Sequence, residues 1–390
     1  MKILVSVCGE GFGHTTRCIS IGEELSKEHD IKFVAYGKSR DFIKRCGYDV
    51  YETYPEIKLS GNEGKFDIKR SIFNKKYNPT KAINREIKII KNYNPDLVIS
   101  DCKYSTVVAS KLLKKPYYVI TNQNYTRTKH KDKFIIYPVM KMLNIMNKSA
   151  MGVLIPDLPM PNTVCEYNLT KLNNLKFIGP LIRYKLDDYE VERGDYILSV
   201  IGGFEYRFRI LKLLNKVAEE KNLKVKMVCG SYEVAEKLRS IKKSKNIKII
   251  PITTDMENLI KHCSFIVCHG GHSTLMESIC FGKPMITIPD LEHPEQENNA
   301  RKINKLKCGI ALSHNTLNND LGHAIDEINN NDIYFKNAEK LRKLCKNYNG
   351  RDNIKRIINK FNNIKMMGKG HDIINNKIDN KINNILKFKI

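Results

Sequence analysis

The sequence predicts an α/β protein in which two doubly wound parallel sheets follow one another along the chain. Its 390 residues leave room for two domains of about 100–200 residues each. Short apolar runs alternate with segments of helical period, and the alternation starts again near Tyr196 after a connecting stretch at 178–194. We therefore expect domains over 1–182 and 194–345, followed over 346–390 by a helix and a tail rich in Lys and Asn.

The first half contains short apolar runs with the length of buried strands. They lie at residues 3–7, 31–36, 96–100 and 117–121. Segments with helical spacing occur between them, at 16–26, 79–92 and 106–113. Strands separated by helices favour a parallel sheet covered on both faces.

The second half repeats this architecture without repeating the sequence. Apolar runs lie at 196–201, 224–229, 247–250, 265–268 and 285–288, and the block 337–367 is predicted to be helical. In open parallel sheets, ligands bind beyond the carboxyl ends of the strands. The loops that directly follow strands are therefore where we look for chemistry.

Composition limits the classes of function. The net charge of +25 attracts anions such as phosphorylated ligands, anionic lipid or nucleic acid, or it reflects the general abundance of Lys. No nucleic-acid-binding motif is present, so no specific nucleic-acid partner is expected. The 11 cysteines include no C-x-x-C pair, which favours reduced thiols and a cytoplasmic protein. Residues 1–7 are read as a first strand, not as a signal peptide.

A glycine-rich loop follows the first strand. Gly9, Gly11 and Gly13 allow a ligand to approach the backbone, and His14 follows at the start of a helix. The spacing differs from the dinucleotide fingerprint, which disfavours NAD binding. His14 is a candidate catalytic base, and the alternative is a histidine that packs against its own helix.

Asp101 follows the strand at 96–100, so it reaches the same edge of the sheet as His14. A carboxylate that accepts the Nδ1 proton of an imidazole fixes its tautomer and makes the other nitrogen a better base. The alternative is that Asp101 caps the next helix. The pair favours the catalytic interpretation.

The strongest signal follows the strand at 265–268. His269, Gly271, Ser273 and Thr274 lie at a turn from strand to helix, where small residues and hydroxyl groups form a nest for phosphates. Glu277 lies three residues after Thr274 and either completes a capping box or accepts hydrogen bonds from ribose hydroxyls.

A second polar pair comes after the strand at 285–288. Glu295 and Gln296 precede Asn299 and Ala300. A carboxylate beside an amide suits the neighbouring hydroxyls of a sugar, although such a pair is also common on plain surfaces.

These motifs resemble the donor-binding domain of GT-B glycosyltransferases, in particular glycosyltransferase family 28 and the UDP-glycosyltransferases. The carried-over pattern is a His, glycines, hydroxyl residues and a Glu eight residues after the His, followed by the E-Q-x-x-N-A element at 295–300. By the same resemblance, Gly202 and Gly203 match the glycines after the first strand of the second domain, and Thr253 opens the loop that holds the nucleotide base. The loop with Gly11, Gly13 and His14 is similar to the acceptor-side loop of these enzymes.

The resemblance implies an inverting sugar transfer from a nucleotide sugar, with UDP favoured, to a hydroxyl acceptor. His14 would deprotonate the acceptor, Asp101 would orient His14, and the nest would hold the diphosphate. No metal and no other cofactor are expected, in agreement with the lack of a D-x-D pair after a strand. His272 departs from the family pattern, and 101–105 lacks the second glycine loop of the lipid-intermediate enzyme, so a lipid-linked acceptor is not implied.

Two rival functions stay open. A UDP-sugar 2-epimerase shares the fold but needs no acceptor, and a non-catalytic nucleotide-sugar-binding protein needs no base. The segment 134–146 is apolar and carries lysines on both sides. It reads either as a core helix or as a peripheral contact with the anionic inner face of the cell membrane, which would suit a lipid-linked acceptor.

Overall fold

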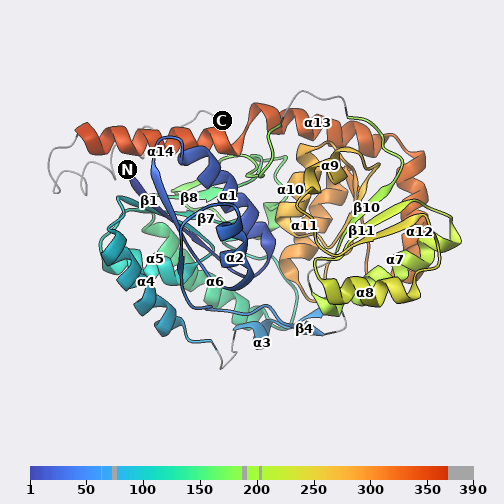
Figure 1. Cartoon of the computed structure of the whole chain (residues 1–390), viewed down its shortest axis with the longest axis horizontal. Helices are drawn as coiled ribbons and strands as arrows, with labels where there is room; N and C mark the ends of the chain where they lie inside the picture. Colours follow the sequence, from blue (N-terminus) through green and yellow to red (C-terminus); the bar gives the residue numbers. More distant parts are fainter. Residues whose placement is uncertain (63, 73–76, 187–190, 202–203, 368–390) are drawn as a thin grey trace.

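The computed structural model describes residues 1–367 except 63, 73–76, 187–190 and 202–203. Figure 1 shows two α/β units side by side, one in blue to green and one in yellow to orange. The prediction of two tandem parallel sheets is confirmed.

The N-terminal unit is built on a seven-stranded parallel sheet of order β3-β2-β1-β6-β7-β8-β9. Its strands are β1 Lys2–Val7, β2 Asp30–Ala35, β3 Val50–Glu52, β6 Leu97–Asp101, β7 Tyr117–Ile120, β8 Gly152–Ile155 and β9 Leu175–Phe177. Its helices are α1 Phe12–Leu25, α2 Gly37–Arg45, α3 Ile68–Ile72, α4 Pro79–Tyr93, α5 Tyr104–Leu112 and α6 Lys133–Lys148. The central strands are buried on both faces, which explains their continuous aliphatic sequence.

The C-terminal unit has a six-stranded parallel sheet of order β12-β11-β10-β13-β14-β15. Its strands are β10 Ile197–Val200, β11 Val225–Val228, β12 Ile247–Ile250, β13 Ile266–Cys268, β14 Met285–Thr287 and β15 Gly309–Ala311. Its helices are α7 Phe208–Glu220, α8 Tyr232–Ile241, α9 Met256–Lys261, α10 His272–Cys280, α11 Pro294–Lys305, α12 Leu317–Asn330 and α13 Ile333–Asn347. Two apolar cores pack on this sheet.

The last described helix, α14 (Gly350–Met367), returns to the N-terminal unit. The sequence predicts a single helical block over 337–367, but the structure has two separate helices there, with a turn between α13 and α14. Ile354, Ile358 and Phe361 of α14 are buried in the same core as strands β1 and β2, and Figure 1 shows α14 lying across this unit above α1. The N-terminal core is therefore completed by the far end of the described chain.

The chain passes between the two units twice, and the two passes touch. A Cβ at Gly179 would lie 1.9 Å from the carbonyl oxygen of Tyr348, and a Cβ at Gly350 would lie 2.4 Å from that of Pro180. Gly179 also has a φ of +85°, which favours glycine. Both positions therefore require glycine for the two connections to pack together.

A short hairpin of the N-terminal unit, β4 (Gly61–Asn62) with β5 (Lys65–Phe66), reaches the other unit. The Phe66 amide donates to the Leu291 carbonyl at 2.7 Å, and the Leu291 amide donates to the Gly64 carbonyl at 2.8 Å. The Phe66 ring also packs on His293, with centroids 4.4 Å apart. The hairpin thus joins the N-terminal unit to the loop that precedes α11.

Candidate active site between the two domains

His14 and Asp101 are brought together at the carboxyl edge of the first sheet. β1 and β6 are neighbours, with Val7 opposite Asp101, so the residues that follow β1 lie beside the end of β6. α1 begins after Gly11, whose φ of 97° turns the chain into the helix, and His14 lies in its first turn. The His14 Nδ1 lies 2.8 Å from Asp101 Oδ1. The carboxylate is fully buried, while the imidazole is 25% exposed, as a base that meets substrate requires.

Arg17 is a third member of this cluster, and the sequence analysis missed it. Its Nε and Nη2 donate to the two oxygens of Asp101, so the carboxylate is held from two sides. Arg17 lies one turn after His14 on α1. Residues three apart share a helix face, so this spacing is the signal that could have identified Arg17.

The electrostatics of the cluster keep Asp101 charged and make His14 more basic. Burial lowers the pKa of His14, but the Asp101 carboxylate outweighs it and raises that pKa to about 9, with the charge of Arg17 acting against the rise. Burial would raise the pKa of Asp101, yet Arg17 and His14 hold it well below its usual range. His14 is therefore fully available as a proton acceptor only in alkaline solution.

The nest opposite His14 is formed by the start of α10. Gly270 has a φ of +81°, and a Cβ on Gly271 would lie 2.6 Å from His269 Nε2, so both glycines are needed for this turn. Ser273 and Thr274 lie in the first turn of α10. The structure therefore places the predicted small and hydroxyl residues at a helix N-terminus, where free backbone N–H groups favour an anion.

The two helix N-termini meet across the domain interface. A Cβ on Gly13 would lie 2.7 Å from Ser273 Oγ, so the glycine loop and the nest touch at this point. Figure 1 shows α1 and α10 side by side where the two units join. The candidate base His14 therefore follows directly in the sequence on Gly13, which lies against Ser273 of the nest.

The Glu277 carboxylate has no hydrogen-bond or ion-pair partner among the described residues, and burial alone raises its pKa to about 7. The N-cap of α10 is Gly271 and has no side-chain capping bond, so the capping-box alternative is not supported. Such a group is suited to accept hydrogen bonds from ligand hydroxyls.

His269 contributes to the nest as a neutral group. Burial, helped by the charge of Arg207, lowers its pKa to about 3. It can donate one N–H to a diphosphate but brings no positive charge.

Glu295 and Gln296 are held by different contacts. Glu295 Oε1 accepts from Asn122 Nδ2 of the N-terminal domain at 2.8 Å. Gln296 is buried, and its amide binds the Asp290 backbone N–H at 2.9 Å and the Asp290 carboxylate at 3.2 Å. Asp290 is also paired with buried Arg207. Glu295 therefore lies at the domain interface, whereas Gln296 shapes the loop before α11.

The other residues predicted to bind the nucleotide sugar are Thr253, Gly202 and Gly203, and the structure says less about them. The Thr253 hydroxyl accepts from the Asp255 backbone N–H at 3.0 Å and so holds its own turn ahead of α9. Gly202 and Gly203 lie outside the described residues.

His272, which departs from the family pattern, points away from the nest. Its Nε2 lies 3.2 Å from Asp157 Oδ2, and both side chains are buried. Ligand atoms of Asp157, Cys165 and His272 lie within 4.8 Å of one another, as do those of His14, Asp101 and Cys102. Both carboxylates are already used, Asp101 by Arg17 and Asp157 by Thr163 and backbone N–H groups. The absence of a catalytic metal stays a prediction.

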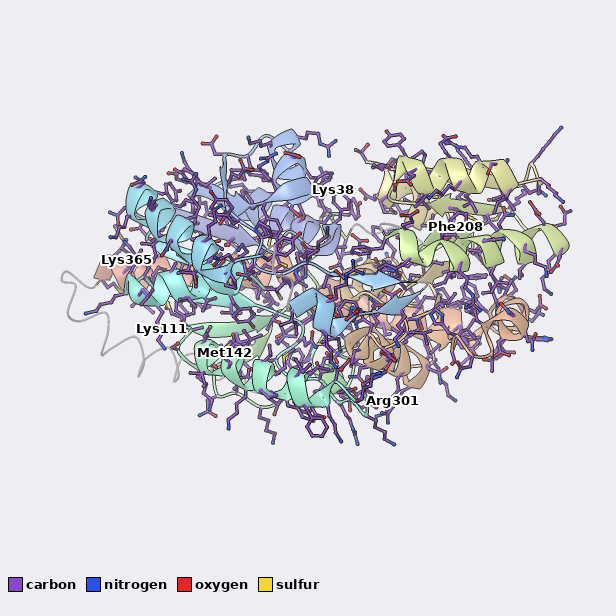
Figure 2. All side chains as sticks on the ribbon, turned by 90° about the horizontal axis from the view of Figure 1, so that it is seen from below. Lys38, Lys111, Met142, Phe208, Arg301 and Lys365 are labelled. Carbon is purple, nitrogen blue, oxygen red and sulfur yellow. The ribbon has the colours of Figure 1, made fainter. Side chains whose placement is uncertain are left out.

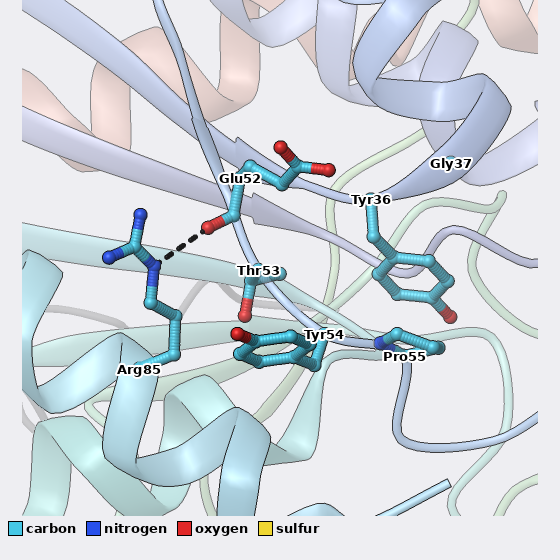
Figure 3. A pocket seen from close by; sticks show the side chains of 7 residues that line it. All are labelled: Tyr36, Gly37, Glu52, Thr53, Tyr54, Pro55 and Arg85. Carbon is cyan, nitrogen blue, oxygen red and sulfur yellow. Dashed lines mark hydrogen bonds between the residues drawn. The ribbon is translucent and has the colours of Figure 1, made fainter. Parts of the chain in front are cut away.

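A separate cavity lies at the carboxyl ends of β2 and β3 and has a volume of about 570 Å³. Figure 3 shows that its lining combines aromatic rings with charged groups; the residues are Tyr36, Gly37, Glu52, Thr53, Tyr54, Pro55 and Arg85. The Tyr36 ring also packs over Gly9, where a Cβ would lie 2.4 Å away. The cavity thus adjoins the glycine loop that leads to His14.

Comparison with known proteins places this geometry in a family. A family model described as glycosyl transferase family 1 matches residues 1–328. An uncharacterized glycosyltransferase of Methanosarcina mazei is 33% identical over an alignment of 376 residues, gaps included, and the match covers 92% of this chain and 98% of the relative.

More distant proteins agree. The UDP-N-acetylglucosamine--N-acetylmuramyl-(pentapeptide) pyrophosphoryl-undecaprenol N-acetylglucosamine transferase of Fusobacterium nucleatum is 24% identical over an alignment of 364 residues, gaps included, and the match covers 88% of this chain and 94% of the relative. Among solved structures, the glycosyltransferase SsfS6 of Streptomyces sp. SF2575, complexed with thymidine diphosphate, aligns with a TM-score of 0.65 at 16% identity, covering 92% of this chain and 99% of its own. The predicted fold class and resemblance are confirmed.

Proposed function

This chain belongs to glycosyl transferase family 1 and is a glycosyltransferase of the GT-B type, and we propose that it transfers a sugar with inversion from a nucleotide sugar to an acceptor hydroxyl. The donor is proposed to be a UDP-sugar, and no metal or other cofactor is needed. One observation carries the proposal. The His14–Asp101 pair of one domain lies beside Gly13, which contacts Ser273 in the phosphate nest of the other domain.

The donor is held by the C-terminal domain. Its diphosphate lies at the N-terminus of α10, where Ser273, Thr274 and backbone N–H groups donate to it. Glu277 accepts from the ribose hydroxyls, which offsets the partial desolvation that raises the pKa of its half-buried carboxylate. The free oxygen of Glu295 is left for a hydroxyl of the donor sugar.

The acceptor is activated by the N-terminal domain. Nε2 of His14 removes the hydroxyl proton while the acceptor oxygen attacks the anomeric carbon. The bond from this carbon to the diphosphate breaks on the opposite side, and the nest stabilises the negative charge that develops there. Asp101 stabilises the imidazolium that forms.

The cavity beside β2 and β3 is proposed as an outer acceptor subsite. The Tyr54 ring is 41% exposed, and Lys81 lies 4.3 Å from its centroid. An exposed ring beside Glu52 and Arg85 suits an acceptor with both apolar and hydroxyl faces.

An acceptor at a membrane surface is supported by α6. Phe134, Met142 and Ile145 are 78%, 50% and 60% exposed, and their spacing puts them on one side of this helix. Figure 2 shows the helix that carries Met142 at the edge of the molecule, with side chains reaching outward from it. Lysines before and within α6 would attract anionic lipid. Among the described residues, no helix combines the length and the apolar character of a membrane span.

The proposal is tested first at the donor site. Thermal unfolding is recorded with UDP-, GDP- and dTDP-sugars at millimolar concentration, because a ligand of the native state raises the midpoint. We expect a rise with UDP-sugars that is lost in Glu277→Ala. No shift with any nucleotide sugar would contradict the donor site, and a shift with dTDP-sugars alone would replace UDP in the proposal.

The two rival functions are separated by the dependence on an acceptor. A sugar 2-epimerase would convert the donor sugar without any acceptor, whereas a non-catalytic binding protein would show the thermal shift but release no nucleoside diphosphate. Release that requires an added hydroxyl acceptor supports sugar transfer.

A further inference from the structure

A chain of buried polar contacts leads from the His14–Asp101 pair to the opposite domain. Arg17 Nη1 donates to Asn122 Oδ1 at 3.3 Å, and Asn122 Nδ2 donates to Glu295 Oε1 at 2.8 Å. Arg17 and Asn122 are only 2% and 6% exposed. The contacts therefore run through the interior of the domain interface from α1, past the loop after β7, to α11.

The charges at the two ends fix the orientation of the Asn122 amide. Its oxygen faces the guanidinium of Arg17, which only donates, and its nitrogen faces a carboxylate, which only accepts. A flipped amide would bring two donors together at one end and two acceptors together at the other. Asp101 binds Arg17 through Nε and Nη2, and Asn122 adds a contact at Nη1 whose orientation is fixed while Glu295 is docked against the amide.

The position of Arg17 matters for the chemistry of His14. Arg17 Nη2 lies 2.9 Å from the same Nδ1 that lies 2.8 Å from Asp101 Oδ1. If the proton lies on Nδ1 and is donated in a hydrogen bond to Asp101, Nε2 keeps a free lone pair and can act as a base. If Nδ1 instead accepts a hydrogen bond from Arg17, the proton lies on Nε2. Nε2 then cannot remove the proton of the sugar acceptor's hydroxyl.

We infer that Arg17 and Asn122 are positioning residues that connect the docking of Glu295 to the tautomer of His14. This inference rests on the proposed role of His14 as the base. Glu295 has one oxygen on Asn122 and Asn299, while among the described residues no donor contacts Oε2. The Glu295 side chain can therefore contact Asn122 across the interface with one oxygen and the donor sugar with the other. His14 becomes a competent base only when the C-terminal domain is in place.

The other groups around His14 do not provide this connection. Cys102 accepts weakly from Arg17 Nη2 at 3.8 Å, and Asp101 belongs to the N-terminal domain itself. Glu10 of the glycine loop has its carboxylate on the Leu59 backbone N–H at 2.9 Å. Of these side chains around His14, only Arg17 is connected to the other domain, through Asn122 and Glu295.

The test is a measurement of the His14 tautomer by NMR in the full chain labelled with ¹⁵N-histidine. Its signals are assigned by their loss in His14→Ala, and spectra are taken above pH 9, where neutral imidazole predominates. We expect the proton on Nδ1 in the native chain and a shift of population toward Nε2 in Asn122→Ala. Glu295→Ala, which removes the oxygen that accepts from Asn122, should produce the same change, and the double variant should add nothing to it.

His130→Ala is the matched control. His130 pairs with Glu297, which lies on α11 near Glu295, and the pair also joins the two domains at 2.9 Å. It has no contact with Asp101 or Arg17 among the described residues. This variant should leave the tautomer unchanged, and a change of equal size would mean that any loss of interface contacts has the effect.

Kinetics provide a second measurement. Asn122→Ala should lower kcat about tenfold, because the hydrogen bonds of its amide to Arg17 and to Glu295 are both lost, and leave the KM for the donor within about twofold. Arg17→Gln removes a neighbouring positive charge and should raise the pKa of His14 by about one pH unit. If Arg17→Gln does not fold, Asn122→Ala alone decides the matter.

An unchanged tautomer in both Asn122→Ala and Glu295→Ala would overturn the inference. This result is distinguishable from failure of the proposed function, because the NMR measurement needs no turnover. A native chain that transfers no sugar would refute the function while the tautomer still reports on the connection.

Discussion

Replacing Glu277 by Gln should stabilise the ligand-free protein while it weakens donor binding, because the amide keeps only one acceptor oxygen. The carboxylate has no partner among the described residues, and burial raises its pKa from an ordinary 4.5 to about 7. In solution above pH 7 the native state therefore holds a charge that the unfolded chain hydrates more easily. For a fully buried carboxylate a pKa rise of this size corresponds to about 3 kcal/mol of lost stability at pH 8, and because Glu277 is only half-buried we expect about 1–3 kcal/mol.

The pH dependence gives this prediction its sign. An acid whose pKa is raised by folding costs nothing below the unfolded value of 4.5, because it is protonated in both states. The cost grows as the pH rises from 4.5 to about 7 and is constant above that. Glu277→Gln should thus gain stability at pH 8 and gain almost nothing at pH 4.

The assay is urea unfolding of both proteins at pH 4 and pH 8, with Glu233→Gln as the control. Glu233 is an exposed carboxylate on α8 that pairs with Lys237, so its replacement should change stability by no more than about 1 kcal/mol. A Glu277→Gln variant that is less stable at pH 8, or whose gain is the same at both pH values, would refute the reasoning.

Three further predictions concern the base, the interface and the last helix. The rate of sugar transfer should rise with pH toward a plateau above about 9, because only neutral His14 is a base. Asp101→Asn should move the rising part of this pH profile to lower pH and lower the plateau. If the rising part does not move, Asp101 is not the group that raises the pKa of His14. Gly13→Ala should cost at least about tenfold in turnover, since its Cβ would lie 2.7 Å from Ser273 Oγ and push the domains apart; steady-state kinetics at saturating donor would show this, and an unchanged kcat would mean that the contact opens freely. Phe361→Ala should reduce the free energy of unfolding by about 3–5 kcal/mol, because this side chain of α14 is buried in the N-terminal core; urea unfolding measures it, and a loss below about 1 kcal/mol would show that α14 is not part of that core.

Much of the fold could be predicted because the parallel strands are short and buried on both faces. Their aliphatic runs stand out from the polar helices, and the strands at 3–7 and 97–101 were placed within a residue or two. The break between α13 and α14 was missed, although Asn349-Gly350 is a turn signal. The hairpin at 61–66 was also missed, since strands of two residues leave no periodicity.

The candidate site was predicted only as far as the local sequence reaches. His14, Asp101 and the nest at 269–274 each follow a strand, so the topology brings them to the sheet edges. Arg17 could have been found from its helical spacing to His14. The contact of Asn122 with Glu295 could not, because it depends on how two separate domains dock, and no pattern within either domain encodes that distance.

The central claim is that His14 removes a proton from the acceptor while the opposite domain holds the nucleotide sugar. The most direct test compares the native chain with His14→Ala at saturating donor and acceptor, with nucleoside diphosphate release and glycosylated product both measured. We predict a fall in turnover of about 10²–10⁴-fold, with the donor-induced rise in melting temperature retained. Full turnover by His14→Ala would contradict the account.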